Sequence, residues 1–173
     1  MLEYPLSYNY KVILFSNLLL FVHSYSLAQC PDNLFISSEE QLTQWVMDYP
    51  NCKVLSGNLT LEGYGTDRLQ NLDALQQIKS IKGSLFIGNN LALNNLDGLS
   101  EIETVVGNVT ISNNPSLKEL KSFSKLNKIE GGLQILNCQQ LRFLDFPRLE
   151  SVGTHLTIFY NPCLLYTSPS PRD

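Results

Sequence analysis

Aliphatic residues recur every 24 positions between residues 69 and 144, and this repeat constrains the fold more than any other feature. The clearest sets of equivalent residues are Leu69, Leu93, Leu117 and Leu141; Leu72, Leu96, Leu120 and Leu144; and Leu85, Val109 and Leu133. A fixed period of roughly 20 to 50 residues is typical of a solenoid, in which similar coils stack on one another. We therefore predict that equivalent aliphatic residues touch inside a shared hydrophobic core.

Each repeat contains a three-residue stretch in which two aliphatic residues flank a residue of another kind. These stretches are Leu59–Leu61, Leu85–Ile87, Val109–Ile111, Leu133–Ile135 and Leu156–Ile158. Because side chains alternate between the two faces of a strand, we expect the flanking residues to be buried and the central residue to face solvent. Stacked coils would align these strands in one parallel sheet, so the predicted fold class is mainly β.

Glycine and asparagine residues occupy fixed positions on either side of these strands. The glycines precede a strand by two residues and the asparagines follow it: Gly83, Gly107 and Gly131, then Asn89, Asn113 and Asn137. Glycine is expected where the backbone turns or where another segment approaches closely. Asparagine tolerates the left-handed conformation of a corner, where its amide can bind backbone groups. We assign structural roles to both sets.

Residues 1–28 have the features of a secretory signal peptide. Lys11 supplies a positive charge, residues 12–22 form an apolar run, and residues 26–28 (Ser-Leu-Ala) fit a small-residue cleavage site. The run is shorter than the ~20 apolar residues that span a bilayer. The alternatives are an uncleaved membrane anchor and a lipoprotein acylated at Cys30, which the residue before that cysteine disfavours.

Residues 163–173 resemble the translation, in one reading frame, of an adapter used in transposase-based sequencing, and we treat them as non-native. The domain to be explained is then residues 29–162. We expect the natural chain to continue beyond Pro162 with residues that this sequence lacks, so that residues 29–162 are a fragment of a longer protein. Leu164 falls at the same repeat position as Leu141, so it can occupy that place in the core whatever its origin.

Cys30 and Cys52 bracket the residues that precede the first coil. An exported chain folds in an oxidising compartment, so we predict a disulfide that closes an N-terminal cap, residues 29–52. Two free thiols are the alternative. Cys138 takes the repeat position of Asn114, and we interpret it as a substituted turn residue with a free thiol.

A short helix is predicted inside this cap. Residues 38–41 (Ser-Glu-Glu-Gln) have the capping-box pattern, in which the serine hydroxyl accepts from a free backbone amide and the glutamine reaches back. Pro50 and Asn51 end the helix. The side chains expected on its apolar face are Leu42, Trp45, Val46 and Tyr49. This face should cover the open end of the first coil, with Trp45 as a core residue rather than a ligand-binding aromatic.

Charge and motif content disfavour nucleic-acid binding and catalysis. The sequence has 12 basic and 16 acidic residues, and residues 1–28 and 163–173 hold two of each, which leaves ten and fourteen. This mildly acidic domain lacks the basic stripe that binds nucleic acid. The outward strand positions hold one acid, Glu62, and His155 has no partners placed for a catalytic triad. Metal-binding spacings are absent from the sequence. We therefore predict no catalytic residues, no cofactor and no metal.

Two consecutive units carry a family resemblance. Residues 81–90 (IKGSLFIGNN) and 105–115 (VVGNVTISNNP) resemble the receptor L-domain repeat. Cys30-Pro31 and residues 49–52 (YPNC) resemble the cap that precedes such repeats in secreted bacterial surface proteins. The resemblance covers nearly all of the trimmed chain. It implies a right-handed, single-stranded β-helix over residues 53–162, related to leucine-rich repeats, and a role in cell-surface recognition or adhesion rather than catalysis. Proteins that share this fold bind different partners.

The outward face of the predicted sheet is the broadest flat surface, and we consider it the candidate binding face for a protein or glycan. Its residues are Thr60, Phe86, Thr110, Gln134, Leu136, Thr157 and Phe159. Phe86, Leu136 and Phe159 are apolar side chains at positions predicted to face solvent, which is typical of a contact surface. The alternative is that loops or a further domain cover them.

These features favour a non-catalytic secreted or cell-surface module for recognition or adhesion, with no membrane insertion of the mature domain. The alternatives are the ligand-binding ectodomain of a receptor or cell-wall protein, and a structural spacer. A polysaccharide lyase or hydrolase is disfavoured because the outward rows lack a carboxylate cluster. Residues 58–60 (Asn-Leu-Thr) and 108–110 (Asn-Val-Thr) match the N-glycosylation sequon, which the repeat alone can also generate.

Overall fold

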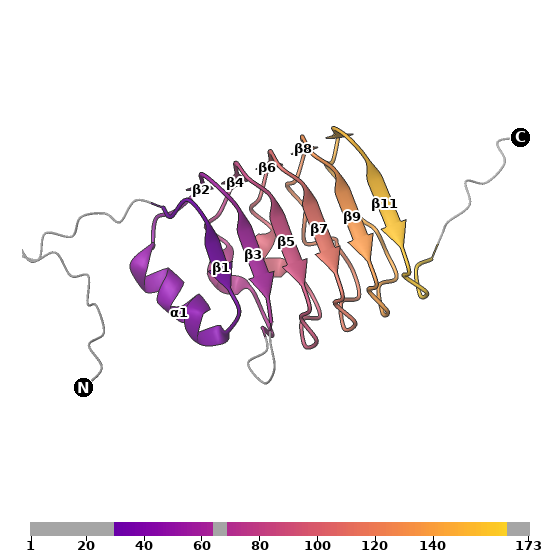
Figure 1. The fold of residues 1–173 in the computed structure, drawn as a ribbon, viewed down its shortest axis with the longest axis horizontal. Helices are drawn as coiled ribbons and strands as arrows, with labels where there is room; N and C mark the ends of the chain where they lie inside the picture. The colour runs from indigo at the N-terminus through magenta and orange to yellow at the C-terminus, as the bar shows by residue number, and fades with distance from the viewer. Residues whose placement is uncertain (1–29, 64–68, 166–173) are drawn as a thin grey trace, which may run out of the picture.

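The computed structural model of the protein describes residues 30–63 and 69–165. Within these residues the chain is mainly β, with two parallel sheets and one α-helix (Figure 1). Successive strands follow one another along the long axis of the molecule, and the helix lies at the N-terminal end. The predicted signal peptide, residues 1–28, lies outside the described residues, as do residues 166–173 of the predicted non-native tail.

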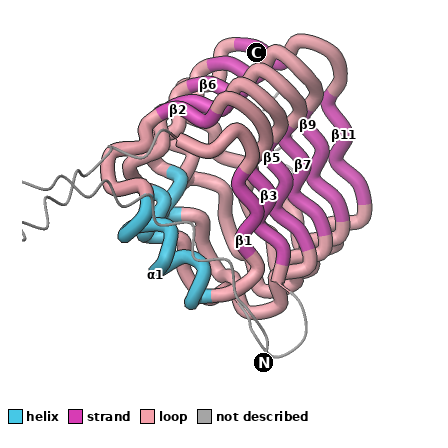
Figure 2. The backbone as a smooth tube through the Cα atoms, turned by 60° about the vertical axis from the view of Figure 1, so that its left-hand side comes forward, coloured by secondary structure: helices cyan, strands magenta, loops and turns pink. Residues whose placement is uncertain are grey.

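The larger sheet has six parallel strands that are arranged in chain order (Figure 2). They are β1 (Leu34–Ile36), β3 (Leu59–Glu62), β5 (Leu85–Gly88), β7 (Val109–Ser112), β9 (Leu133–Leu136) and β11 (Leu156–Phe159). The predicted register is confirmed: Leu85 lies beside Val109, which in turn lies beside Leu133. The sequence analysis missed β1, which pairs with β3 and extends the sheet by one strand.

A second parallel sheet contains five strands of two residues each. They are β2 (Val54–Leu55), β4 (Ser80–Ile81), β6 (Thr104–Val105), β8 (Lys128–Ile129) and β10 (Ser151–Val152), again in sequential order. The sequence analysis predicted only the larger sheet and missed this second one. Strands of two residues are too short to show an alternating pattern, so only their buried column of Ile81, Val105 and Ile129 indicated an ordered element.

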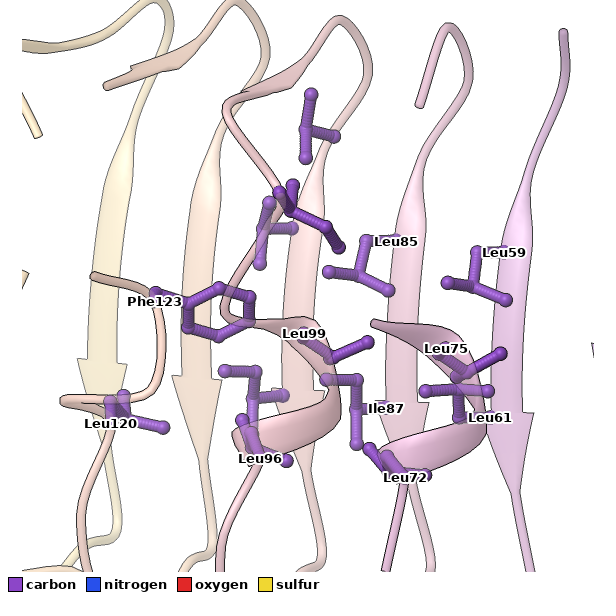
Figure 3. Close-up of a cluster of buried hydrophobic side chains, with 14 of the residues drawn as sticks. Leu59, Leu61, Leu72, Leu75, Leu85, Ile87, Leu96, Leu99, Leu120 and Phe123 are labelled. Carbon is purple, nitrogen blue, oxygen red and sulfur yellow. The ribbon is translucent and has the colours of Figure 1, made fainter. Parts of the chain in front are cut away.

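The hydrophobic core is built from the aliphatic columns of the 24-residue repeat. Figure 3 shows equivalent pairs such as Leu72 and Leu96 repeated along the stack, on the inner side of the larger sheet. Two short 3-10 helices, η1 (Asp73–Leu75) and η2 (Asp97–Leu99), end in leucines that are fully buried. Full burial of one such side chain contributes about 1.5–3 kcal/mol, so neighbouring coils stabilise one another through these columns.

The N-terminal cap contains the predicted disulfide between Cys30 and Cys52, and the predicted helix α1 (Glu39–Asp48). Ser38 caps the helix, because its hydroxyl accepts a hydrogen bond from the Gln41 backbone amide at 3.2 Å. The Gln41 side chain reaches one residue further back than the capping-box pattern specifies, to the backbone amide of Ser37 at 2.7 Å. Side chains thus satisfy two backbone amides at the start of the helix, those of Ser37 and Gln41.

The inner face of α1 closes the N-terminal end of the core. Leu42 and Trp45 are buried, and Tyr49 stacks on Trp45 with ring centroids 5.0 Å apart. Trp45 is therefore a core residue, as predicted. Val46 was predicted on the same face, but it is 42% exposed, because it lies at the margin of the apolar stripe and points toward solvent.

The C-terminal end of the stack has no covering element among the described residues. Leu156 in β11 is 59% exposed although its equivalents in β5, β7 and β9 are buried, so the prediction that its side chain is buried was wrong. Burial in a solenoid requires a neighbour on both sides, and Leu156 has a neighbouring strand on one side only. Leu164 is 7% exposed and occupies the repeat position of Leu141, as expected from the spacing.

Candidate functional site

Two rows of outward-pointing side chains form the exposed face of the six-stranded sheet. The central row is Phe35, Thr60, Phe86, Thr110, Gln134 and Thr157. The outer row is Glu62, Gly88, Ser112, Leu136 and Phe159. Strand pairing places all seven residues of the predicted binding face in these two rows. We call this surface the sheet face.

Aromatic side chains lie at both ends of the sheet face. Phe35 in β1 is 51% exposed and Phe159 in β11 is 65% exposed. Sequence analysis missed Phe35, although Leu34–Ile36 has the same alternation of buried and outward residues as the later strands. Phe159 is followed by the exposed Tyr160, and their ring centroids are 5.7 Å apart. Exposed aromatic groups of this kind favour contact with another molecule, because covering them removes a large apolar area from water.

Phe86 at the middle of the sheet face is only half-buried, and its ring lies over Gly88. A Cβ atom built on Gly88 would be 2.4 Å from Phe86 Cζ, so the ring occupies the space of the missing side chain. Phe86 therefore lies flat against its own strand rather than projecting from it. Its outer surface remains available for contact, while its inner surface covers the backbone of β5.

The polar groups of the sheet face are partly engaged with one another. Glu62 accepts a hydrogen bond from Asn89 Nδ2 at 2.6 Å. The Gln134 and His155 side chains are joined by a hydrogen bond of 2.8 Å, and the second ring nitrogen of His155 lies 3.0 Å from the Thr154 hydroxyl. These contacts fix the orientation of the side chains before any partner binds. The two rows contain one carboxylate and neither lysine nor arginine.

Two ladders of asparagine support the corner that follows each strand of the sheet face. The outer ladder, Asn89, Asn113 and Asn137, has the predicted left-handed backbone, with φ of 58°, 55° and 52°. Its amides bind each other, at 3.1 Å from Asn113 to Asn89 and 2.7 Å from Asn137 to Asn113. The prediction that they bind backbone groups was wrong, because strands about 4.8 Å apart bring equivalent amides within reach of each other.

The inner ladder is buried and binds the backbone. Its members are Asn90, Asn114 and Asn161. Asn90 donates to the Leu61 carbonyl at 3.0 Å and accepts from the Gly63 amide at 2.8 Å. Cys138 interrupts this ladder with a buried free thiol, which confirms its interpretation as a substituted turn residue. Burial raises the pKa of this thiol, against hydrogen bonds with Asn114 that lower it, so Cys138 is not an activated nucleophile.

The opposite edge of the sheet face is fixed by close backbone contacts between glycines. The Gly107 amide donates to the Gly83 carbonyl at 2.8 Å, and a Cβ on Gly107 would lie 2.7 Å from that carbonyl carbon. Close approach therefore explains why glycine is required there. Beside this edge, Asn58 and Asn108 of the two sequons are exposed, and their Oδ1 atoms each accept a backbone hydrogen bond of 2.7 Å from the next coil. A glycan on Nδ2 would leave these bonds intact.

The described residues contain no group of three or more His, Cys, Asp or Glu side chains that could hold a metal ion. His155 binds Gln134 and Thr154, which are neither acids nor bases, so the arrangement resembles no catalytic triad. No helix in the described ranges has the length and apolar character needed to span a membrane. What the sheet face offers is a rigid, mostly uncharged surface with exposed aromatic groups.

Stacked leucine-rich coils with two parallel sheets, and an N-terminal helix bracketed by a disulfide, define a parallel β repeat protein. Residues 91–171 match the family model of the Receptor L domain. The match confirms the resemblance carried by residues 105–115 and continues into the tail that the sequence analysis excluded. Receptor L domains are extracellular ligand-binding modules rather than enzymes. No curated protein matches the sequence.

Proposed function

We propose that this protein is a secreted or cell-surface recognition module that binds a protein or glycan partner through the sheet face. Its coils would form a right-handed β-helix, and the mature domain would begin after a signal peptide of residues 1–28. The observation that supports this proposal best is the exposure of Phe35 and Phe159 on a sheet face whose other large apolar side chains, Phe86 and Leu136, are half-buried.

The physical reason is that a few aromatic anchors supply most of the binding energy in many interfaces. Hot-spot residues are enriched in large, rigid side chains that become fully desolvated by the partner. Phe35 and Phe159 are at opposite ends of the sheet face, so one extended partner, or a partner with two contact regions, would cover both. The threonines between them would contribute hydroxyl groups at a polar centre.

The Cys30–Cys52 disulfide supports an extracellular location, because disulfides persist in oxidising compartments. Adhesion to a surface and ligand binding by a receptor ectodomain are both compatible with this location. A cell-wall protein or a structural spacer would use the same coils, but a spacer would have no use for exposed aromatic groups on a flat face. We therefore favour recognition over a purely structural role.

An array of extracellular-matrix proteins and glycans, probed with the labelled protein, tests the proposal directly. For any ligand found, Phe35→Ser combined with Phe159→Ser should weaken binding by at least about tenfold, because each removes an exposed aromatic anchor. Met47→Ser is the matched control, since Met47 is an exposed apolar residue on α1, away from the sheet face. Circular dichroism should show unchanged melting for all three substitutions.

Binding that is unaffected by the double substitution would contradict a role for the sheet face. Loss of folding in the double variant would instead identify the two rings as part of the core. Phe86→Ser is a weaker test of binding, because the Phe86 ring also covers Gly88. Its removal exposes backbone and therefore affects stability as well.

A further inference from the structure

A groove of about 590 Å3 lies outside the six-stranded sheet, beside the segments that follow β5, β7 and β9. Its lining includes Asn94, Lys118, Gln140, Arg142 and Phe143. None of these residues belongs to the sheet face, so the groove is a separate surface. Its chemistry also differs, because the sheet face carries no lysine or arginine.

Backbone hydrogen bonds place the two cations of the groove on successive coils. The Lys118 amide donates to the Asn94 carbonyl at 3.3 Å, and the Arg142 amide donates to the Lys118 carbonyl at 2.9 Å. Lys118 and Arg142 occupy the same repeat position, so their side chains leave adjacent rungs about 4.8 Å apart. Like charges at neighbouring positions repel each other, so this pair of cations does not stabilise the isolated domain.

The acidic residue of the groove does not neutralise these cations. The Glu119 carboxylate is paired with Lys121 at 2.5 Å, a contact that raises the pKa of Lys121. Lys118 and Arg142 form no ion pair within the part of the chain that the structure describes. The groove thus keeps two positive charges in a protein whose formal net charge is −4.

The uncharged residues of the groove add further hydrogen-bond donors. Asn94 Oδ1 already accepts from Asn95 Nδ2 at 2.8 Å, which leaves its own Nδ2 as a donor. The Gln140 side chain is exposed and makes no hydrogen bond to the described residues. Phe143 is 51% exposed at the same wall, where it offers a flat apolar surface. A complementary ligand must therefore be rich in acceptors and also present an apolar face.

We propose that this groove binds an oligosaccharide that carries carboxylate groups, such as a chain of uronic acids. The guanidinium group of Arg142 can hold a carboxylate through two parallel hydrogen bonds, with Lys118 as a second positive charge. The amides of Asn94 and Gln140 match sugar hydroxyls, and the ring of Phe143 can cover the C–H face of a pyranose. An acidic peptide would satisfy the cations but would lack the hydroxyl groups.

Calorimetric titration with tetragalacturonate and with uncharged tetragalactose tests this assignment, using the full chain with Cys163→Ser to remove an exposed thiol of the same groove. The acidic tetramer should bind at least about tenfold more tightly, and added salt should weaken its binding. Lys118→Gln combined with Arg142→Gln should abolish this preference. Lys82→Gln is the control, since Lys82 is an exposed lysine outside the groove.

Three results would overturn the proposal: equal binding of the two sugars, an acidic preference that survives the double substitution, or binding of tetraglutamate in place of tetragalacturonate. The last result would identify an acidic peptide as the ligand. Phe35→Ser with Phe159→Ser should leave tetragalacturonate binding unchanged, so a failure of this groove and a failure of the sheet face are distinguishable.

Discussion

Cys138 is the residue at which the repeat departs most clearly from its own pattern. At the equivalent positions of neighbouring coils, buried asparagines donate to a strand carbonyl of the preceding coil, as Asn114 does to Ile87 at 2.9 Å. By the same spacing, the acceptor for position 138 is the Ile111 carbonyl. The thiol of Cys138 instead lies 3.6 Å from the Leu136 carbonyl, a weak contact for sulfur. The ladder is therefore incomplete at this coil.

Cys138→Asn should raise the free energy of unfolding by about 1 kcal/mol, because it restores one buried hydrogen bond to Ile111 and one from the Asn114 amide. Urea denaturation of the variant and of the original chain measures the difference. Cys138→Ala is the control that removes the thiol without adding an amide, and it should not stabilise the chain. If Cys138→Asn proves less stable than Cys138→Ala, the core has no space for an asparagine side chain at position 138, and the asparagine ladder cannot be completed there.

Single residues also show where sequence analysis succeeds and fails. The columns of buried aliphatic residues and the left-handed asparagines could be predicted, because repetition reveals positions with one fixed environment. The position of the Phe86 ring over Gly88 could not be predicted, because it depends on the absence of a Cβ atom at Gly88 in the same strand. The cations of the groove were also missed. Lys118 and Arg142 share a repeat position with Asn94, so this position shows no fixed residue type in the sequence.

At the scale of elements, α1 is defined by its capping groups as much as by its apolar face. The hydroxyl of Ser38 satisfies the Gln41 amide, and the Gln41 side chain satisfies the Ser37 amide. These signals lie within five residues of each other, which is why the helix could be predicted from sequence. The second sheet could not, because strands of two residues carry no alternating pattern, and β1 was missed because it precedes the 24-residue repeat that identified the other strands.

Ser38→Ala should lower the free energy of unfolding by about 1 kcal/mol, since it leaves one amide of the first helical turn without its acceptor. Trp45 is the single tryptophan of the chain and lies on this helix, so its fluorescence reports urea unfolding of the cap. Ser56→Ala is the matched control, because Ser56 is an exposed serine outside α1 whose hydroxyl makes no hydrogen bond to the described residues. Equal losses from the two substitutions would show that the Ser38 hydroxyl is not the acceptor that stabilises the helix.

At the scale of the whole molecule, the two ends of the stack differ. The N-terminal end is closed by α1 and the Cys30–Cys52 disulfide, whereas β11 has a partner strand on one side only. Leu85 and Leu156 have the same place in the sequence pattern, yet the first is fully buried and the second is largely exposed. Position along the stack, which no local pattern records, thus decides how much a residue contributes to stability.

Leu85→Ala should therefore cost about 2–5 kcal/mol of unfolding free energy, as expected for a fully buried leucine, whereas Leu156→Ala should cost less than about 1 kcal/mol. Urea denaturation at low protein concentration measures both, with the two chemically identical substitutions serving as controls for each other. A large cost for Leu156→Ala would mean that another surface covers β11 in solution. Repeating the measurement over a range of protein concentrations would then reveal whether that surface is a second copy, because only association makes the cost of the substitution depend on concentration.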